Sequence, residues 1–302
     1  MTDVPAALRE ELAADFRFPA LQPEVVARSA DDTRKLLFRL DERTAIESVI
    51  IPELPRLTLC ISSQAGCGMA CAFCATARLG LIRNLRADEI IGQVLAARSE
   101  LHFDERLTNL VFMGMGEPLA NYEAIVEAIE VLTADWGVGL SSRRITVSTV
   151  GLVPAMSRLV AETKVNLAVS LSGTTDEQRA RLMPINRRFG LKELIGACRA
   201  LPLPDRRRVT FEYVMLAGVN DSIADADRLI RLLHGVRSKV NLIPFNPFPD
   251  AGFERSSDDV IRRFQRRLLD GGVNATIRRS RGRDVQAACG QLALAKDRRP
   301  DV

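Results

Sequence analysis

Histidine, lysine and long apolar runs are scarce in this sequence. Its 302 residues include only two histidines, His102 and His234, which excludes a histidine-rich metal site and a relay of histidine acid–base catalysts. Only five of its 42 basic residues are lysines, and the arginines that predominate carry a planar guanidinium suited to phosphates and stacked bases. No apolar run reaches the roughly 18 residues of a membrane span, and no secretory signal pattern is present. We therefore expect a cytoplasmic globular protein.

The six cysteines are too few for a disulfide scaffold, and they are unevenly spaced. Four of them lie close together in the sequence: Cys60, Cys67, Cys71 and Cys74. This clustering indicates a metal site built on thiolates. Cys198 has no such neighbours, and we assign it to core packing.

Positive charge is concentrated near the C-terminus. Residues 261–302 contain eleven Arg or Lys residues and four acidic residues, whereas the whole chain has a net charge of only +4. An arginine-rich segment of this kind is compatible with RNA binding, and equally with a solvated helix face. The charge pattern alone does not decide between the two.

From residue 57 onward, short β-rich runs alternate with amphipathic helical patterns. Near-continuous apolar strands joined by helices predict an α/β fold with a parallel sheet, and six repeats without a reversal favour a partial (β/α)6 TIM-like barrel. The expected strands are 57–62, 109–114, 143–150, 165–171, 208–216 and 239–246, with a seventh near 273–281.

Residues 1–52 form a separate expected unit ahead of this barrel. They contain one helical run, 5–16, and two strand-like runs, 33–40 and 45–52. We expect a small accessory α/β module over 1–52 and the catalytic core, with its basic C-terminal segment, over 53–302.

The first barrel strand leads into a loop with the spacing Cys67-x3-Cys71-x2-Cys74. Barrels place their chemistry at this carboxyl end of the strands. Three thiolates can hold three irons of a [4Fe-4S] cluster and leave the fourth iron open to another ligand. The alternative is a zinc site with Cys60 as the fourth ligand.

Polar residues or glycines follow several later strands. The second strand ends in Gly114-Met115-Gly116-Glu117-Pro118, where a carboxylate stands beside exposed backbone groups that can bind an ammonium. Each such residue alone is more often a cap or turn residue, but their recurrence at one end of the sheet indicates a binding site. The others are Ser148, Ser170, Ser172 and Asn246.

Several segments resemble the RlmN/Cfr family of radical S-adenosylmethionine (SAM) adenosine methyltransferases. The cysteine spacing resembles the superfamily signature, and the match extends along nearly the whole chain. The segments are CISSQAGCGMACAFCATARLGLIRNL, VFMGMGEPLANY, VSTVGLVP, LMPIN, LIPFNPFP and RGRDVQAACGQL.

The resemblance implies a [4Fe-4S] cluster held by Cys67, Cys71 and Cys74, with SAM bound to the open iron. It implies further that Gly116 and Glu117 bind the SAM amine. The remaining cofactor contacts would come from Ser148, Ser170, Leu171, Ser172 and Asn246. The family usually has SLHAP where this chain has Ser170-Leu171-Ser172-Gly173-Thr174.

The resemblance also implies three catalytic residues. Cys289 matches the cysteine that carries a methyl group from one SAM, and a second SAM supplies the radical that attaches this carbon to adenine. Cys60 matches the thiol that releases the RNA by forming a disulfide with Cys289, and Glu47 matches the proton acceptor. Read without the family, Glu47 would be an ordinary strand carboxylate, and the two cysteines buried core thiols.

The function implied is the RlmN type, which forms 2-methyladenosine in the peptidyl transferase region of 23S rRNA and in tRNA next to the anticodon. An electron donor such as flavodoxin and a monomeric state are expected. The opening segment resembles the middle of the family's N-terminal domain, so we expect a shortened module. The alternatives are Cfr-type C8 methylation, a radical enzyme acting on another protein, and a zinc-dependent RNA-binding protein without catalysis.

Overall fold

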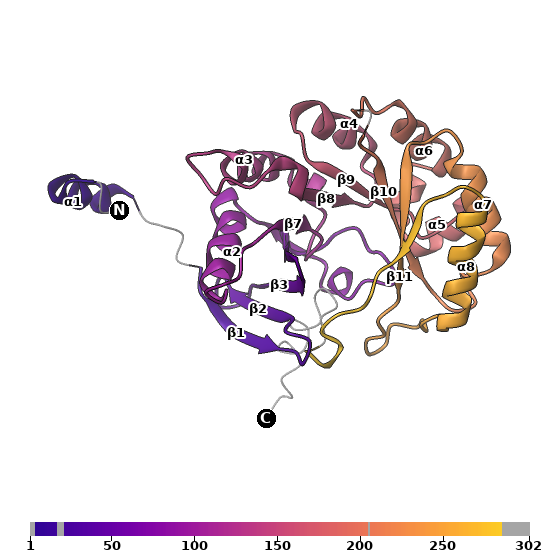
Figure 1. The fold of residues 1–302 in the computed structure, drawn as a ribbon, viewed down its shortest axis with the longest axis horizontal. Coiled ribbons are helices and arrows are strands. Elements are labelled where there is room, and N and C mark those ends of the chain that lie inside the picture. The colour runs from indigo at the N-terminus through magenta and orange to yellow at the C-terminus, as the bar shows by residue number, and fades with distance from the viewer. Residues whose placement is uncertain (1–3, 17–20, 205, 286–302) are drawn as a thin grey trace.

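The computed structural model describes residues 4–16, 21–204 and 206–285. Ten strands form one sheet in the order β1-β2-β3-β4-β7-β8-β9-β10-β11-β12 (Figure 1). From β4 onward every neighbouring pair in this sheet is parallel, which confirms the expected partial barrel and its seventh strand. The parallel strands are β4 (Arg56–Ile61), β7 (Asn109–Phe112), β8 (Ile145–Thr149), β9 (Asn166–Ser170), β10 (Val209–Met215), β11 (Ser238–Pro244) and β12 (Ala275–Ile277).

Helices cover the outer face of this sheet (Figure 1). Except for α5, whose Leu182 packs in a separate cluster with Cys71, their apolar faces pack on the strands in one continuous core, which explains why the strands read as apolar runs rather than as alternating patterns. None of the helices within the described residues is long and apolar enough to cross a membrane. The helices are α2 (Ala87–Ser99), α3 (Tyr122–Thr133), α4 (Val153–Glu162), α5 (Asp176–Leu182), α6 (Leu191–Ala200), α7 (Ile223–Leu233) and α8 (Asp258–Asp270).

The N-terminal strands continue the barrel sheet with antiparallel pairing. Strand β1 (Pro23–Arg28) pairs with β2 (Arg34–Arg39), β2 pairs with β3 (Ala45–Glu53), and β3 pairs with β4. The sequence predicted β2, β3 and helix α1 (Ala6–Asp15) but not β1. Strand β1 is half-exposed and begins with proline, and its residues do not alternate between apolar and polar. It therefore carries no sequence pattern that marks a strand. Helix α1 buries none of its residues.

A small second sheet frames the cysteine loop. It consists of β5 (Gln64–Gly66) and β6 (Leu81–Asn84), which pair antiparallel on either side of the loop. Gly66 has a φ of 71°, and a Cβ at this position would lie 1.9 Å from the carbonyl oxygen of Gly80. Only glycine allows the two strands to approach this closely. The loop is therefore closed at its base by backbone contacts.

Candidate active site

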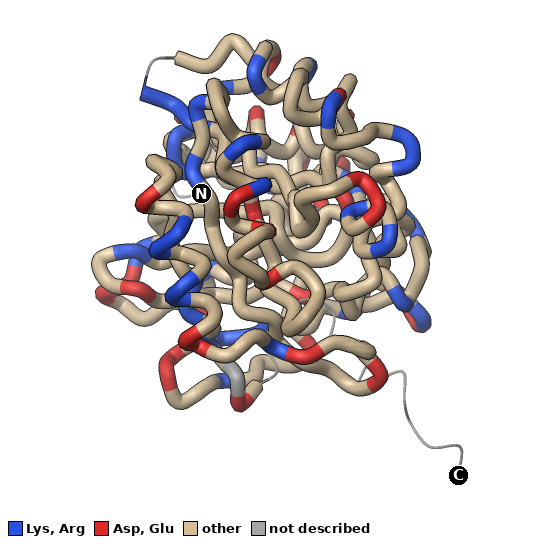
Figure 2. The backbone as a smooth tube through the Cα atoms, turned by 90° about the vertical axis from the view of Figure 1, so that its right-hand side faces the viewer, with Lys and Arg blue, Asp and Glu red and all other residues tan. Residues whose placement is uncertain are grey.

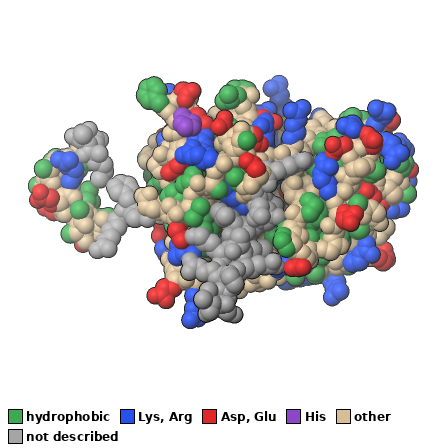
Figure 3. Space-filling model, turned by 90° about the horizontal axis from the view of Figure 1, so that it is seen from below, with side chains coloured by type: hydrophobic (Ala, Val, Ile, Leu, Met, Phe, Trp, Pro, Cys, Tyr) green, Lys and Arg blue, Asp and Glu red, His purple; other side chains and the backbone are tan. Residues whose placement is uncertain are grey.

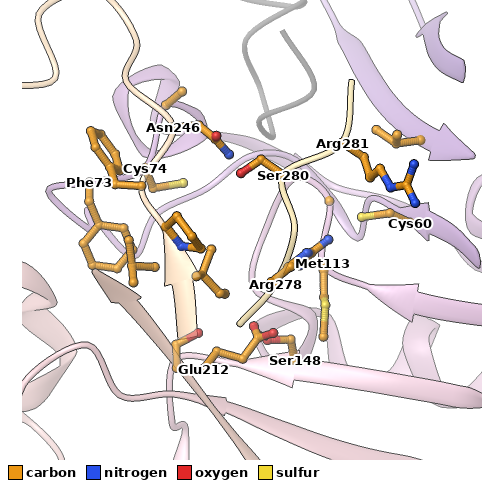
Figure 4. A pocket seen from close by; sticks show the side chains of 18 of the residues that line it. Cys60, Phe73, Cys74, Met113, Ser148, Glu212, Asn246, Arg278, Ser280 and Arg281 are labelled. Atoms are coloured by element: carbon orange, nitrogen blue, oxygen red, sulfur yellow. The ribbon is translucent and has the colours of Figure 1, made fainter. Parts of the chain in front are cut away.

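A cavity of about 310 Å³ opens at the carboxyl ends of the parallel strands, where barrels bind their ligands. We call it the reaction cavity (Figure 4). It brings together residues from β4, the cysteine loop, the ends of β7 to β11 and the segment after β12. The lining residues that the sequence predicted are Cys60, Cys74, Gly116, Glu117, Ser148, Ser170 and Asn246.

The cysteine loop presents its thiols between this cavity and the protein interior. Cys67 and Cys71 are buried, whereas Cys74 is half-buried and lines the cavity. The backbone N–H of Cys67 donates to the carbonyl of Gly80 at 2.7 Å, and that of Ala72 donates to the carbonyl of Leu182 at 2.9 Å. These bonds fix the loop between β6 and the end of α5.

Burial makes the thiolate forms of these cysteines costly. Burial raises the pKa of Cys67 to about 11 and raises the pKa of Cys71 further. The neighbouring charge of Cys74 also raises both pKa values. Buried thiolates are stable only when positive charge neutralises them, as iron does. No three His, Cys, Asp or Glu side chains within the described residues are placed to hold a single metal ion. A [4Fe-4S] cluster instead binds each thiolate through a different iron.

The thiol of Cys60 lies apart from this loop. In Figure 4, Phe73, Cys74 and Asn246 border one side of the cavity, and Cys60 lies on the other side beside Arg281. A tetrahedral zinc site would require Cys60 and the loop thiols to converge on one ion at about 2.3 Å. The three loop cysteines therefore fit a cluster, and Cys60 stands where a substrate in the cavity can reach it.

The turn after β7 holds Glu117 at the back of the cavity. Gly116 adopts a φ of 100°, and a Cβ there would lie 2.5 Å from the Gln64 side chain, which explains the glycine. Glu117 accepts hydrogen bonds from the backbone N–H groups of Leu119 at 3.0 Å and Val150 at 2.8 Å. Complete burial nevertheless raises the pKa of Glu117 to about 7. The Thr149 side chain is a third hydrogen-bond partner, so the carboxylate keeps about one lone pair for a further donor such as an ammonium.

Glu212 is a cavity residue that none of the sequence motifs predicted. It lies on β10 opposite Ser170 of β9, and Ser148 of β8 donates a hydrogen bond to its Oε2 at 3.1 Å. Its Oε1 is buried without a hydrogen-bond partner among the described residues. Figure 4 shows Glu212 and Ser148 together at one end of the cavity. A carboxylate inside the apolar run VTFEYVML was the signal in the sequence that could have revealed it.

Leu171 and Ser172 differ from the other expected cofactor contacts because they are fully buried and are absent from the cavity lining. Ser172 accepts a hydrogen bond from the backbone N–H of Val214 at 3.2 Å, and its own carbonyl accepts one from Asn220 at 2.9 Å. The serine that stands in place of the family's histidine thus ties β9 to the loop after β10. Its expected contact with the cofactor stays a prediction.

Glu47 and Cys289 are the two predicted catalytic residues that the described cavity lining does not include. Glu47 is buried on β3, with its Oε1 3.3 Å from the ammonium of Lys35, and it does not line the cavity. Cys289 lies outside the described residues, but Arg278 and Arg281, in the chain that leads toward it, line the cavity. Cys198 is buried in the main core, as predicted.

Known proteins resemble this chain over nearly its whole length. The radical SAM superfamily matches residues 61–230 of the chain. The dual-specificity RNA methyltransferase RlmN of Geobacter sulfurreducens is 53% identical over 97% of this chain and 80% of its own length. That of Anaeromyxobacter dehalogenans is 51% identical over the same shares. A crystal structure of a radical SAM methyltransferase from Sphaerobacter thermophilus superposes with a TM-score of 0.91 and 47% identity, covering 96% of this chain and 86% of that one.

The fold and the three-cysteine loop thus define a radical SAM enzyme, a class whose cofactors are a [4Fe-4S] cluster and SAM. Within this class, the chain belongs to the family of the dual-specificity RNA methyltransferases RlmN. The resemblance noted from the sequence motifs is confirmed.

Proposed function

We propose that the protein methylates carbon C2 of adenosine in the peptidyl transferase region of 23S rRNA and in tRNA next to the anticodon. The observation that carries this proposal is a single cavity that brings Cys74, Ser148 and Cys60 together. A cluster ligand, a cofactor contact and the thiol that would release the product thereby face the same small volume. A base inserted into this volume would meet all three.

Cys67, Cys71 and Cys74 would hold the cluster, which supplies the electron that cleaves SAM to a 5′-deoxyadenosyl radical when both are bound. Glu117 would accept a hydrogen bond from the SAM ammonium with the lone pair left over from its contacts with Leu119, Val150 and Thr149. The unpartnered Oε1 of Glu212, with Ser148 beside it, would accept the ribose hydroxyls of the same cofactor.

On the opposite side of the cavity, Cys60 would act on the sulfur of Cys289. Cys289 carries the methyl group, and its bond to the methylated base breaks when the Cys60 thiolate attacks its sulfur and forms a disulfide. Glu47, which forms a buried ion pair with Lys35, would accept the proton that leaves the adenine carbon.

We further propose a monomeric cytoplasmic enzyme that receives electrons from a donor such as flavodoxin. We also propose that residues 1–52 form an accessory module and residues 53–302 the core. The change from antiparallel pairing to parallel pairing at β4 supports this boundary.

The direct test is mass spectrometry of nucleosides from a 23S rRNA fragment and from tRNA incubated with reconstituted protein, SAM and a reductant. We expect 2-methyladenosine in both RNAs, and its loss from cells that lack the gene. Formation of 8-methyladenosine would assign the protein to the Cfr-type reaction. Unmodified RNA with active cofactor cleavage would contradict the proposal.

A cysteine substitution tests the cluster separately. Cys71→Ala should abolish iron and sulfide binding after anaerobic reconstitution, because it removes one of three buried ligands. Cys198→Ala is the matched control: its thiol is equally buried but lies in the core under α6, so iron content should be unchanged. Zinc bound by the wild type with a dependence on Cys60 would favour the non-catalytic alternative.

A further inference from the structure

A second cavity, of about 300 Å³, adjoins the reaction cavity at the first turn of α8. It lies between the end of β11, the segment after β12 and the loop before α8. Four arginines and one aspartate are among the residues that line it: Arg255, Arg262, Arg278, Arg279 and Asp258. We call it the arginine cavity. Its lining is far more basic than that of the reaction cavity.

The surrounding surface does not share this excess of one charge. The end of the molecule opposite α1, where α7 and α8 lie, carries basic and acidic residues interleaved (Figures 2 and 3). The arginine cavity is therefore a local concentration of positive charge and not part of a uniformly basic face. A local concentration favours one anionic group at a defined place.

The charges of these arginines are only partly neutralised by the protein. Arg255 pairs with Asp258 at 2.5 Å, and Arg262 pairs with Asp259 at 2.7 Å; Arg255 is partly buried, and the other three side chains are exposed. Exposed pairs of this kind are weak, so an incoming anion can compete for the same guanidiniums. Arg278 and Arg279 have no ion pair within the described residues.

Arg255 is held in place by the backbone. Residue 255 forms an antiparallel bridge with Leu216, just after β10, and the neighbouring Glu254 carbonyl accepts the N–H of Ala217 at 2.9 Å. The Nε of Arg255 is buried and has no hydrogen-bond partner among the described residues. A buried donor without an acceptor is costly, and a bound oxyanion would remove this cost.

The two cavities share part of their lining. Pro244, Arg278, Arg279 and Ser280 line both. A nucleotide whose base enters the reaction cavity therefore brings the phosphates of its own strand to the mouth of the arginine cavity. Guanidinium groups bind phosphate oxygens in a bidentate manner, which matches this lining.

We propose that the arginine cavity binds a phosphodiester of the RNA strand next to the adenosine that enters the reaction cavity. This inference rests on the proposed RNA methyltransferase function and specifies how that site holds its substrate. The phosphate contact fixes the register of the strand, while the reaction cavity receives the base. The flipped base and its flanking phosphate are then held by adjoining parts of one surface.

The test uses phosphate neutralisation in a stem-loop RNA from the 23S rRNA region that contains the target adenosine. Single methylphosphonates are placed in turn at the phosphates flanking this nucleotide, and binding to the reconstituted protein is measured. We expect one or two positions at which wild-type affinity falls about tenfold, as for the loss of a charged hydrogen bond. Arg255→Gln/Arg262→Gln should bind the unmodified RNA more weakly and lose nothing further at those positions.

The matched control is Arg263→Gln/Arg266→Gln, which removes the same charge from exposed positions of α8 outside the cavity. It should keep the wild-type sensitivity at the same phosphates. The two double variants should also differ in the salt dependence of RNA binding. Removing one phosphate-binding arginine lowers the slope of log binding constant against log salt concentration by about 0.7 on single-stranded RNA, so only Arg255→Gln/Arg262→Gln should show this change.

The proposal is overturned if no flanking methylphosphonate weakens wild-type binding, or if both double variants respond alike. The interference measurement on the wild type needs no substitution, so it stands even if a variant folds poorly. Methylation of the unmodified stem-loop is checked first. If methylation occurs without phosphate interference, only the arginine cavity assignment fails; if the RNA is neither bound nor methylated, both assignments fail.

Discussion

Two buried carboxylates in the reaction cavity, Glu117 and Glu212, differ in how many hydrogen bonds they accept from the protein. Glu117 accepts two backbone N–H groups, whereas Glu212 accepts only the Ser148 hydroxyl and leaves Oε1 without a partner among the described residues. An unsatisfied buried acceptor costs free energy in the empty protein. A ligand that donates to it recovers that free energy, so Glu212 contributes more to binding than to folding.

The substitution Glu212→Gln tests this residue. Removing the charge should weaken SAM binding to the reconstituted protein about tenfold or more, the value of a charge-assisted hydrogen bond. The thermal unfolding midpoint of the cofactor-free protein should stay level or rise, because a buried charge is removed. Glu127→Gln, at an exposed position on α3, should change neither quantity. A lower midpoint with unchanged SAM affinity would show that Glu212 is structural.

Glu117 predicts a pH dependence of stability. Its pKa is raised from 4.5 to about 7 by burial, so the folded protein keeps a proton that the unfolded chain releases. This difference in pKa stabilises the folded protein by at most about 3 kcal/mol. The stabilisation is complete below about pH 4.5, decreases as the pH rises toward 7 and is lost above pH 7. Denaturant unfolding of cofactor-free wild type and Glu117→Gln between pH 5 and 8 measures this difference. Parallel curves for the two proteins would refute the prediction.

Among the elements, the β1–β2 turn anchors the segment that leads toward Cys289. Asp284 accepts hydrogen bonds from the Ser29 hydroxyl at 2.5 Å and from the Ala30 backbone N–H at 3.0 Å. In return, Asp31 accepts the N–H of Gly282 at 3.1 Å. The antiparallel strands at the start of the sheet thereby hold a segment from the other end of the chain. They position the substrate side of the cavity and not the cluster loop.

Asp284→Ala should therefore lower the rate of RNA methylation without changing the rate of SAM cleavage. Methylation of RNA should fall severalfold because two hydrogen bonds that hold this segment are removed, each worth about 1 kcal/mol or more. Cleavage of SAM without RNA should be unchanged, since the cysteine loop makes none of these hydrogen bonds. The readout is 5′-deoxyadenosine and methylated RNA from one reaction. Glu42→Ala, in the exposed β2–β3 turn, serves as the control, and an equal fall in both products would contradict this role.

The elements that the sequence failed to predict share a physical cause. Strand β1 is half-exposed at the edge of the sheet, and β5 and β6 are three and four residues long. Their strand conformation comes from pairing with a distant segment, and short or exposed strands carry too little apolar pattern to reveal such pairing. The long buried strands β10 and β11 were predicted because their own residues form the core.

At the scale of the whole molecule, the proposed reaction requires the chain to bring Cys60 on β4 together with Cys289, which follows β12 in the sequence. The proposed roles of these cysteines differ in their order, which two variants can separate. Cys289→Ala should stop methylation at the outset, with no methyl group on the protein and no RNA adduct. Cys60→Ala should still load the methyl group and then accumulate a covalent protein–RNA complex through Cys289.

Intact-mass spectrometry of both variants after incubation with RNA distinguishes these outcomes. Cys198→Ala, which lacks a thiol in the core, should turn over as the wild type does. Normal turnover by Cys60→Ala, or an RNA adduct on Cys289→Ala, would show that the two thiols do not act in this order. A disulfide requires their sulfurs to approach to about 2 Å, so the result also shows whether the two thiols can meet.

The amino-acid sequence alone was enough to establish the β/α alternation and the family and to predict the cluster ligands. These depend on local spacing: three cysteines within one loop, and apolar periodicity within each strand and helix. The folded arrangement was needed to show that Glu212 faces Ser148, that Cys60 lies across the cavity from Cys74, and that Arg262 lines a cavity while Arg263 and Arg266 do not. These relations join residues on different strands or depend on helix rotation, so the packing of the whole sheet fixes them and no local pattern records them.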